Sequence, residues 1–598
     1  MAFAQRSTET GDTAVKRPIR GWVAYGLVGL TAILLASLTV RLVHIQRELR
    51  PELMEWSQRR LSSTIPLPGR RGMILDRRVR VLAGSHLLPT VFADPRLVED
   101  RAVAAECLAP LLERPAGELR EALEHPTSPA FVILGRGIAP ETARAIEALK
   151  LRGIGTRDEP VRTYPNGPLA AHVLGFVGSD GHGLEGVEMT LDSYLRGKPG
   201  RRVVVRDIRR RPVFERPDDY VAPQDGMHVV LTIDVAIQEI LEREVQAAFE
   251  KYRAEAALGV VLSAKSGEVL ALAVAPGFDP AAPGDVPASY RRNRVVTDPM
   301  EPGSVFKPFV MAAAIEAGVT HPNEMIHCRN GVHYFGRRRL NDHHPYGLLS
   351  VEQILVHSSN IGMAFLGLRL GNEKMHDALK RQGFGEKTGI DLPGESEGML
   401  LPLSQWNSYS TTSVPMGQEV AVTPIQMAAA FCGLVNGGQR VQPHVVAAVL
   451  DRNYRLLEDR RPKVAPPDAV NPAVSAIMRD ILAKVVNEGT GRPCRLEGWQ
   501  VMGKTGTAQV PWENRRGYEP NAYLGSFMAA APAHDPEIVV LMMVRKPDRR
   551  IGYYGSRVAA PGVRAVLAEA LPYLNVPQDP PASEERHEGI SLAADQRP

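Results

Sequence analysis

The sequence predicts an α+β protein of several domains that is held in a membrane by one N-terminal helix. The chain has 598 residues, which is too many for one ordinary hydrophobic core. Residues 21–40 carry no charge and match the ~20 residues that a helix needs to span a bilayer. In the second half, a strand, a long amphipathic helix and two further strands follow one another. This order favours helices packed against a mainly antiparallel sheet.

The N-terminal region is predicted to comprise a cytoplasmic tail, residues 1–20, and a transmembrane helix, residues 21–41. Basic residues precede the apolar run, and such flanks stay in the cytoplasm. The rest of the chain then lies outside the inner (cytoplasmic) membrane, and the protein crosses this membrane once. A cleaved signal peptide is the competing interpretation, but the apolar run is long for one and no small-x-small cleavage site follows it. The basic residues are Arg6, Lys16, Arg17 and Arg20.

Residues 42–222 are predicted to form a first extracytoplasmic domain of α+β structure without evident chemistry. We expect a polar helix over residues 43–63, an alternating strand over 79–83, and helices over 102–112 and 141–149. Residues 209–226 are charged, contain prolines and have no periodicity, so they predict a linker.

Residues 223–576 are predicted to form a second domain, in which helices pack on an antiparallel sheet. Its first part reads as a strand over residues 229–233, an amphipathic helix over 235–252 and two strands within 257–275. Residues 577–598 are polar and contain prolines, so we expect a disordered tail.

The distribution of charge argues against a nucleic-acid partner, and the spacing of cysteines and histidines argues against a metal or other cofactor. The formal net charge is +4, and basic residues are interleaved with acidic ones instead of forming a stripe. The cysteines form no C-x-x-C pair, and we expect them to be buried or free. One stretch rich in histidine matches no zinc spacing and favours a solvated loop near a cleft. The cysteines are Cys107, Cys328, Cys432 and Cys494, and the stretch contains His327, Cys328, His333, His343 and His344.

Ser304 and Lys307 are the first candidate catalytic pair. If residues 304–317 form a helix that ends at Gly318, positions i and i+3 share one face, and the amine can reach the hydroxyl. A serine needs a base to take its proton, and a lysine can do so only when it is neutral. Because burial and a neighbouring positive charge lower a lysine pKa, we predict a second cation nearby. The alternative is a helix start with a snorkelling lysine.

Two further groups of polar residues follow. Ser358 and Asn360 lie between two predicted short helices, the first of which opens with a capping box at residues 350–353. A simple helix cap is the alternative for this pair. Downstream, residues 503–509 read Gly-Lys-Thr-Gly-Thr-Ala-Gln after a strand-like segment, and glycines in a strand let another backbone approach closely. Lys504 is the candidate second cation, although an ideal strand places Lys504 and Thr505 on opposite faces.

In this order, Ser-x-x-Lys, Ser-x-Asn and Lys-Thr-Gly form the signature of penicillin-binding proteins and serine β-lactamases. The chain resembles a class B penicillin-binding protein over most of its length. One departure is Arg78-Val79, where the family often has Asn-Gly. Further matching motifs are Arg71-Gly72-x-Ile74-x-Asp76-Arg77, Tyr164-Pro165, Leu169 to Gly175, Gly183 to Glu188, Leu231 to Asp234, Glu301-Pro302-Gly303-Ser304, Thr423 to Gln426, Asn436-Gly437-Gly438, Tyr554-Gly555 and Ala559-Ala560-Pro561.

The resemblance implies a pedestal domain of the dimerisation type, followed by a transpeptidase domain of the penicillin-binding and β-lactamase fold. It implies that Ser304 attacks the bond between two terminal D-alanines and that Lys307 takes its proton. Ser358 with Lys504 would return a proton to the leaving D-alanine, and Asn360 would hold the peptide amide. Substrate-binding residues would be Lys504, Thr505, Gly506 and Thr507, and the backbone N–H groups of Ser304 and Thr507 would form the oxyanion hole.

The implied partners are peptidoglycan stem peptides that end in D-Ala-D-Ala, β-lactams, a membrane-embedded glycan polymerase and other division proteins. The motifs look most like those of the septal member of the family. An elongation-type transpeptidase, a β-lactamase or β-lactam sensor, and an inactive division scaffold are the alternatives. A domain of some 180 residues between membrane and catalytic half is superfluous for β-lactam hydrolysis, and the intact motifs argue against a scaffold.

Two other motif matches have poor context. Residues 498–505 formally match a nucleotide-binding P-loop, but this motif needs a following helix, and Pro511 comes soon after. A second Lys-Thr-Gly, residues 387–389, comes too soon after Asn360 and leads into a loop, so we assign it no catalytic role.

Overall fold

The structure is a computed structural model that describes residues 21–50, 62–126, 128–206, 212–215, 217–462, 469–512 and 514–579. The predictions for residues 1–20, 51–61 and 580–598 lie outside the described residues. The chain divides into two compact units. The first comprises Met1–Leu67 and Pro199–Pro223, and the second comprises Pro68–Lys198 and Gln224–Pro598.

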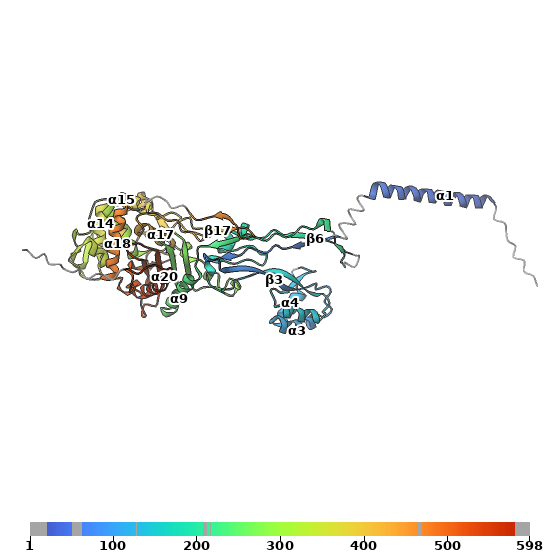
Figure 1. Cartoon of the computed structure of the whole chain (residues 1–598), viewed down its shortest axis with the longest axis horizontal. Coiled ribbons are helices and arrows are strands. Elements are labelled where there is room, and N and C mark those ends of the chain that lie inside the picture. Colours follow the sequence, from blue (N-terminus) through green and yellow to red (C-terminus); the bar gives the residue numbers. More distant parts are fainter. Residues whose placement is uncertain are drawn as a thin grey trace, which may run out of the picture. The chain divides into compact units, whose positions relative to one another are not determined.

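The first unit contains helix α1, Gly21–His44, none of whose residues is buried in the protein (Figure 1). A π-helical turn, Ile45–Leu49, continues it, and the whole stretch is long and apolar enough to cross a membrane. An apolar helix without a buried face suits insertion into lipid, because acyl chains then cover its side chains. The helix therefore indicates a single-pass membrane anchor.

The same unit contains a small antiparallel sheet in the order β1-β6-β7, which corrects two sequence predictions. Ser62 already belongs to a strand, so the helix predicted over residues 43–63 does not reach its predicted end. Strand β7 lies within the predicted linker. Both β1 and β7 pair with β6, and local periodicity does not report pairing between distant segments. The strands are β1 Ser62–Leu67, β6 Gly200–Arg206 and β7 Pro212–Glu215.

Residues 68–198 of the second unit include a lobe in which three helices pack on three strands (Figure 1). The helices predicted over 102–112 and 141–149 are confirmed. The strand predicted over 79–83 is confirmed from Val81 onward, but it continues to Ala93. The elements are β3 Val81–Ala93, α3 Arg101–Leu112, α4 Ala116–Glu124, β4 Val132–Gly135, α5 Pro140–Ala148 and β5 Ile154–Thr163.

One seven-stranded sheet joins this lobe to the C-terminal half of the chain. Its order is β18-β17-β8-β2-β3-β4, and β5 also pairs with β3, from Gly84 to Ala93. Strands β2 and β8 are parallel, and the other pairs are antiparallel. The remaining strands are β2 Ile74–Leu75, β8 His228–Leu231, β17 Val446–Leu450 and β18 Leu456–Asp459.

A buried ion cluster lies beside this sheet. The Glu188 side chain is fully buried and accepts hydrogen bonds from Arg71 Nε at 2.5 Å and Arg162 Nε at 2.6 Å. Arg71 Nη1 also donates to Asp192 Oδ1 at 2.5 Å. Each charge in the cluster is therefore paired, as burial of charges requires.

The turn between β2 and β3 contains Val79 at a φ of +64°. Asp76 Oδ1 accepts hydrogen bonds from the N–H groups of Arg78 and Arg80, so the turn forms although the family's usual Asn-Gly is absent. A β-branched residue is strained in this left-handed conformation. Because Val79 is largely exposed, replacing it removes little buried surface.

We therefore expect Val79→Asn to raise the free energy of unfolding by about 1 kcal/mol, since asparagine tolerates this conformation. The midpoint of urea unfolding of the full-length protein in detergent, followed by tryptophan fluorescence, measures the gain. Val79→Ala, which only removes the branching, should gain less. A midpoint that stays the same or falls in Val79→Asn would show that Val79 is not strained.

The C-terminal half is built on a five-stranded antiparallel sheet in the order β10-β9-β21-β20-β19. The predicted strand over 229–233, helix over 235–252 and strand pair within 257–275 are confirmed as β8, α9 and β9 with β10. Strand β19 lies at the edge of the sheet. The elements are α9 Val235–Lys251, β9 Ala256–Ser263, β10 Val269–Ala275, β19 Met502–Pro511, β20 Tyr518–Ala531 and β21 Ile538–Arg545.

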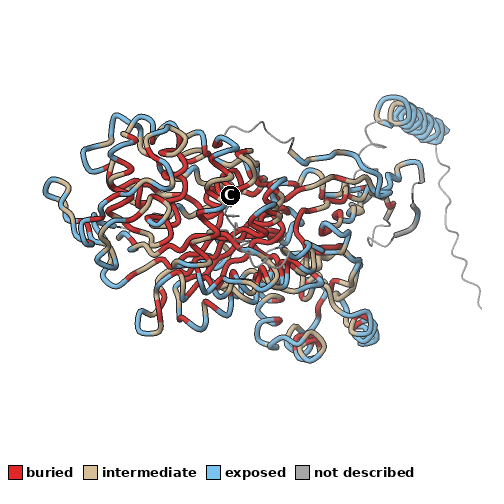
Figure 2. Tube along the Cα trace, turned by 60° about the vertical axis from the view of Figure 1, so that its left-hand side comes forward, coloured by how far each residue is buried: buried red, intermediate tan, exposed pale blue. Residues whose placement is uncertain are grey.

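Helices cover both faces of this sheet. Figure 2 shows buried residues concentrated in the interior of the fold. Leu241 of α9 and Leu567 of α20 share one core with Val261 and Val540. On the opposite face, α12, α17 and α18 form a second core with the alternate strand residues. The predicted packing of helices on an antiparallel sheet is thus confirmed. These helices are α12 Lys307–Glu316, α17 Pro424–Val435, α18 Pro472–Asn487 and α20 Ala560–Tyr573.

Candidate active site

The backbone around Gly303 positions Ser304 next to the edge strand. A 3₁₀ turn, Gly303–Phe306, leads directly into α12, so the predicted helix over 304–317 is confirmed with a tighter first turn. Gly303 has a φ of +60°, and a Cβ there would lie 3.1 Å from Ala508 Cβ. Only glycine meets both conditions without strain. The turn therefore brings the partly exposed Ser304 close to Thr507.

Lys307 is fully buried behind Ser304 and bonds to the second motif. Its Nζ donates to the Ser358 carbonyl at 2.6 Å, to Asn360 Oδ1 at 2.8 Å and to Ser358 Oγ at 3.2 Å. Among the described residues, no hydrogen bond joins Lys307 to the Ser304 hydroxyl, which the i, i+3 spacing had led us to expect. Catalytic hydrogen bonds in a ligand-free site are often long and tighten when substrate binds.

Burial lowers the pKa of Lys307 to about 7, while the charge of Asp342 acts in the opposite direction. The predicted second cation is Lys504, whose Nζ donates to Ser358 Oγ at 2.9 Å and to the Thr505 carbonyl at 3.0 Å. Burial, and then the charge of Lys307, lower the pKa of Lys504 well below its ordinary value. Two lysines with lowered pKa values therefore meet at one serine hydroxyl.

Ser358 and Asn360 lie at a corner between helices α13, Val351–Val356, and α14, Asn360–Leu370. The predicted capping box at residues 350–353 is confirmed. Ser358 has a φ of +59°, and non-glycine residues in this conformation often mark functional sites. The side chain of Ser359 caps α14 by accepting from the N–H of Gly362 at 3.0 Å, which leaves the neighbouring Ser358 and Asn360 to face Lys307.

Asp342 fixes this corner, and sequence reasoning missed it. Its Oδ1 accepts from the N–H groups of Asn360 at 2.5 Å and Ile361 at 3.1 Å, and its Oδ2 accepts from Ser359 Oγ at 2.6 Å. Asp342 directly follows the hairpin of β12, Val332–Phe335, and β13, Arg338–Asn341. No spacing in the sequence connects this hairpin with α14, because only the tertiary fold brings them together.

On β19, Lys504 and Thr505 follow the alternation of a strand, yet both reach the site. Lys504 is fully buried, and its long side chain turns toward Ser358, whereas Thr505, Gly506 and Thr507 line the cleft. Thr505 Oγ1 and Thr490 Oγ1 are hydrogen-bonded at 2.9 Å. A Cβ on Gly506 would lie 2.4 Å from Ser526 Oγ, so the strand needs glycine at this position.

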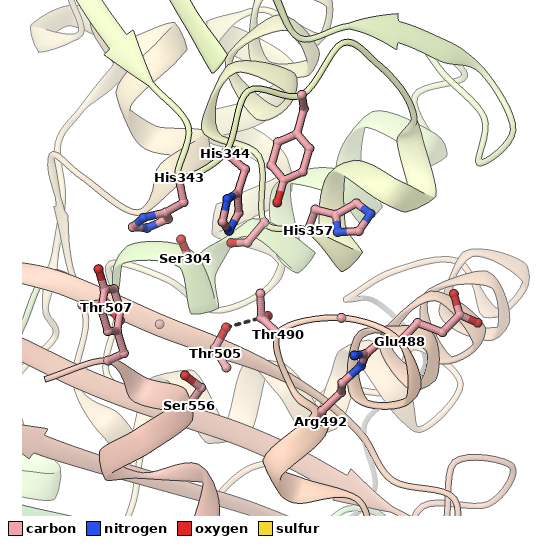
Figure 3. A pocket seen from close by; sticks show the side chains of 15 residues that line it. Ser304, His343, His344, His357, Glu488, Thr490, Arg492, Thr505, Thr507 and Ser556 are labelled. Carbon is pink, nitrogen blue, oxygen red and sulfur yellow. Dashed lines mark hydrogen bonds between the residues drawn. The ribbon is translucent and has the colours of Figure 1, made fainter. Parts of the chain in front are cut away.

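The cleft has a volume of about 510 Å³ (Figure 3). Of the predicted site residues, Ser304, Ser358, Thr505, Gly506 and Thr507 line it, whereas Lys307, Asn360 and Lys504 are joined to it through Ser358. Figure 3 shows Glu488 and Arg492 together at the end away from Ser304. The lining residues that sequence reasoning did not assign to the site are His343, His344, Tyr346, His357, Glu488, Gly489, Thr490, Arg492, Tyr554 and Ser556.

The histidine-rich stretch and the four cysteines were the remaining candidates for a metal site or for disulfides. His343 and His344 line the cleft, and the stretch that contains them forms the β12–β13 hairpin in addition to a loop. Within the described ranges, no group of three or more histidine, cysteine or acidic side chains could hold a metal ion. Cys328, Cys432 and Cys494 are buried, and none of the four cysteines is paired.

Residues 498–505 do not form a nucleotide-binding P-loop, and the second Lys-Thr-Gly, residues 387–389, does not belong to the cleft. Lys504 and Thr505 lie within β19, and a second strand follows, where a P-loop requires a helix. At the second Lys-Thr-Gly, the N–H and hydroxyl of Thr388 both bond to Glu395, and this segment does not line the cleft.

Two family models of known proteins match the chain. A family model described as the penicillin binding protein transpeptidase domain matches residues 257–568, and one described as the penicillin-binding protein dimerisation domain matches residues 66–231. The chain belongs to the class B penicillin-binding proteins. It has the two-domain α+β fold of that family, with a dimerisation-type pedestal and a transpeptidase domain.

Individual relatives of this class B penicillin-binding protein align over most of its length. Stage V sporulation protein D of Bacillus subtilis is 35% identical over 551 residues, which cover 91% of this chain and 84% of that protein. Peptidoglycan D,D-transpeptidase FtsI of Escherichia coli is 30% identical over 535 residues, 87% of this chain and 86% of that protein. The crystal structure of penicillin-binding protein 3 from Mycobacterium tuberculosis complexed with aztreonam is similar with a TM-score of 0.66 and 29% identity, covering 86% of this chain and 99% of that chain.

Proposed function

We propose that this chain is a serine D,D-transpeptidase that cross-links peptidoglycan stem peptides through an acyl-enzyme. The observation that carries the proposal is the convergence of Lys307 and Lys504 on Ser358, next to a partly exposed Ser304 and an edge strand. A neutral Lys307 takes the proton of Ser304 as its oxygen attacks the carbonyl between two D-alanines. Ser358 and Lys504 return a proton to the amine of the leaving D-alanine.

The edge strand β19 provides the binding groups in this mechanism. A stem peptide adds to the edge like a further strand, so its main chain pairs with β19. Thr505, Gly506 and Thr507 receive the terminal carboxylate, together with Lys504, and Asn360 holds the peptide amide. The N–H groups of Ser304 and Thr507 stabilise the oxyanion, at about 3 kcal/mol for each donor. The amine of a second stem peptide then attacks the acyl-enzyme and forms the cross-link.

We further propose that the enzyme acts in septal wall synthesis and is a target of β-lactams. Its domains would be a cytoplasmic tail, 1–20, an inner-membrane anchor, 21–41, a pedestal, 42–222, a periplasmic transpeptidase domain, 223–576, and a disordered tail, 577–598. The apolar helix α1 and the basic residues before it support the orientation. The anchor and pedestal would contact a glycan polymerase of the membrane and other division proteins. The crystal structure of a relative complexed with aztreonam supports β-lactam binding.

Intact-protein mass spectrometry after exposure to a fluorescent penicillin tests the proposal. We expect a stable adduct on the full-length protein and none on Ser304→Ala. Ser556→Ala is the matched control, because Ser556 also lines the cleft but has no hydrogen bond to either lysine. Slow release of the adduct would argue against a β-lactamase. If folded wild-type protein forms no adduct, Ser304 is not the nucleophile and the scaffold alternative gains support.

The rate of acylation is expected to depend on pH through Lys307. The folded protein holds the pKa of Lys307 near 7, so the amine is neutral above this pH and protonated below it. Only the neutral form can accept the proton of Ser304. The second-order rate constant for penicillin acylation should therefore level off above pH about 7 and fall about tenfold per pH unit below it. A rate that stays constant down to pH 5 would contradict this role of Lys307.

A further inference from the structure

The imidazole of His343 lies in the active-site cleft and has no role in the mechanism proposed above. His343 lines the cleft and is exposed. Figure 3 shows it at the same end of the cleft as Ser304, on the wall opposite Thr505 and Thr507 of β19. Within the described ranges, neither ring nitrogen of His343 has a hydrogen-bond partner. The ring nitrogens are therefore available to a ligand in the cleft.

The fold sets the position of this imidazole through its neighbour in the chain. The Asp342 carboxylate accepts hydrogen bonds from Ser359 Oγ at 2.6 Å and from the N–H of Asn360 at 2.5 Å. These bonds fix the backbone before His343 at the corner that carries the second motif. The His343 ring meets the Tyr554 ring edge-on, with ring centres 5.9 Å apart. The imidazole is thus held from the backbone and from the ring.

The groups around His343 favour its neutral form. Partial burial of the ring, and then the charge of Lys307, lower the pKa of His343, and the opposing effect of Asp342 is smaller. The titratable groups that face the ring are Lys307, Lys504, Asp342, His344 and Tyr554. Since an ordinary histidine has a pKa of about 6.5, this imidazole is neutral at pH 7 and can accept a proton.

The second half of the proposed reaction releases a proton. An aliphatic amine is an ammonium at pH 7, so its nitrogen carries three protons on arrival and one in the new amide. One of the two protons that it loses returns to the Ser304 oxygen as the ester bond breaks. Ser358, which bonds to both Lys307 and Lys504, can carry that proton. The other proton must leave first, because an ammonium has no lone pair with which to attack.

We propose that the imidazole of His343 takes this first proton from the ammonium of the acceptor stem while the acyl group is on Ser304. The neutral nitrogen then attacks the acyl carbonyl and forms the new C–N bond. The C–O bond to Ser304 breaks, and Ser358 passes a proton to the Ser304 oxygen. The imidazolium finally releases its proton to solvent. The inference rests on the proposed function, because it needs an acyl-enzyme on Ser304.

Hydrolysis of the same acyl-enzyme provides an internal reference. Water arrives neutral and passes one proton toward Ser304, and the acid product ionises only after the ester bond has broken. Hydrolysis therefore needs no base that removes a proton before attack. Loss of the His343 imidazole should slow the attack by an amine and spare hydrolysis, whereas a general distortion of the site would slow both.

The test follows the two fates of one acyl-enzyme in the full-length protein in detergent. A thioester of an N-acylated D-alanine acylates Ser304 with release of a thiol, and Nα-acetyl-lysine serves as an acceptor amine with an ordinary pKa of about 10.4. Chromatography measures the ratio of amide to acid product. At pH 7, we expect His343→Gln to lower this ratio about 10²-fold, a usual contribution of a general base. The rate of penicillin labelling of Ser304 should stay unchanged.

The pH dependence separates a base from a structural role. In the wild-type protein, the ratio should change little between pH 7 and pH 9, because His343 removes the proton from the bound ammonium. In His343→Gln, it should rise about tenfold per pH unit, since only the neutral fraction of the amine can attack. His333→Gln is the matched control and should behave as wild type. His333 belongs to the same stretch, packs against the Phe335 ring at 4.6 Å and does not line the cleft.

An amide-to-acid ratio in His343→Gln that equals the wild-type ratio at pH 7 would overturn the inference. A wild-type protein that forms no amide, or whose ratio already rises about tenfold per pH unit, would also overturn it. An equal loss of penicillin labelling in folded His343→Gln would give His343 a structural role instead. Absence of both thiol release and penicillin labelling in the wild-type protein is a different result, because it would overturn the proposed function and with it this inference.

Discussion

Replacing Lys307 by methionine is expected to lower the rate constant for penicillin acylation by roughly 10²–10⁴-fold, the usual contribution of a general base. Methionine keeps the length and burial of the side chain but cannot accept a proton. Stopped-flow or gel-based labelling at pH 8 measures the rate.

Lys484→Met is the matched control for this experiment. Lys484 is a half-exposed lysine in α18 that pairs with Glu352 at 2.8 Å, away from Ser304. We expect its acylation rate to stay within about twofold of wild type, since exposed ion pairs contribute little. Thermal melting of both variants shows whether they are folded. If folded Lys307→Met loses less than about tenfold, another group takes the proton of Ser304.

Replacing Glu188 by glutamine is expected to destabilise the second unit by about 3–5 kcal/mol. The exchange keeps the shape of the side chain but removes the charge that both Arg71 and Arg162 share. Two buried guanidiniums are then left with one remaining carboxylate, Asp192. Urea unfolding of the full-length protein, followed by tryptophan fluorescence, measures the loss.

Glu118→Gln provides the comparison, because Glu118 pairs with Arg114 at 3.1 Å on an exposed helix. Its loss should be about 0.5 kcal/mol or less. A loss below about 1 kcal/mol in Glu188→Gln would mean that water or a rearranged Asp192 compensates the two guanidiniums.

Local patterns in the sequence predicted those parts of the fold that depend on neighbouring residues. The helix after Ser304, the capping box at Ser350 and the strand pair after α9 each follow from periodicity or from end signals within a few residues. The ordered motifs also selected five residues that line the cleft and three that bond behind it.

The remaining features depend on contacts between distant segments. Asp342 reaches the corner at Ser359 and Asn360 only because the β12–β13 hairpin folds over α14. Thr490 enters the site through its bond to Thr505, and β7 exists as a strand only beside β6. Periodicity placed Lys504 and Thr505 on opposite faces, which is correct, but it could not show that a long side chain bends back to Ser358.

The seven-stranded sheet gives the second unit a particular mechanical character. Strand β3 pairs with all ten residues of β5, and the same sheet continues through β2 and β8 to β17 in the catalytic half. A pull along β3 loads this ladder in shear, so many hydrogen bonds carry the force together. The lobe of α3 and α4 is therefore stiff along β3, whereas the sheet continues to the catalytic half only through β2, whose two residues pair with β3 on one side and with β8 on the other. A force applied to this lobe would therefore reach β8 and β17 of the catalytic half through the few hydrogen bonds of β2.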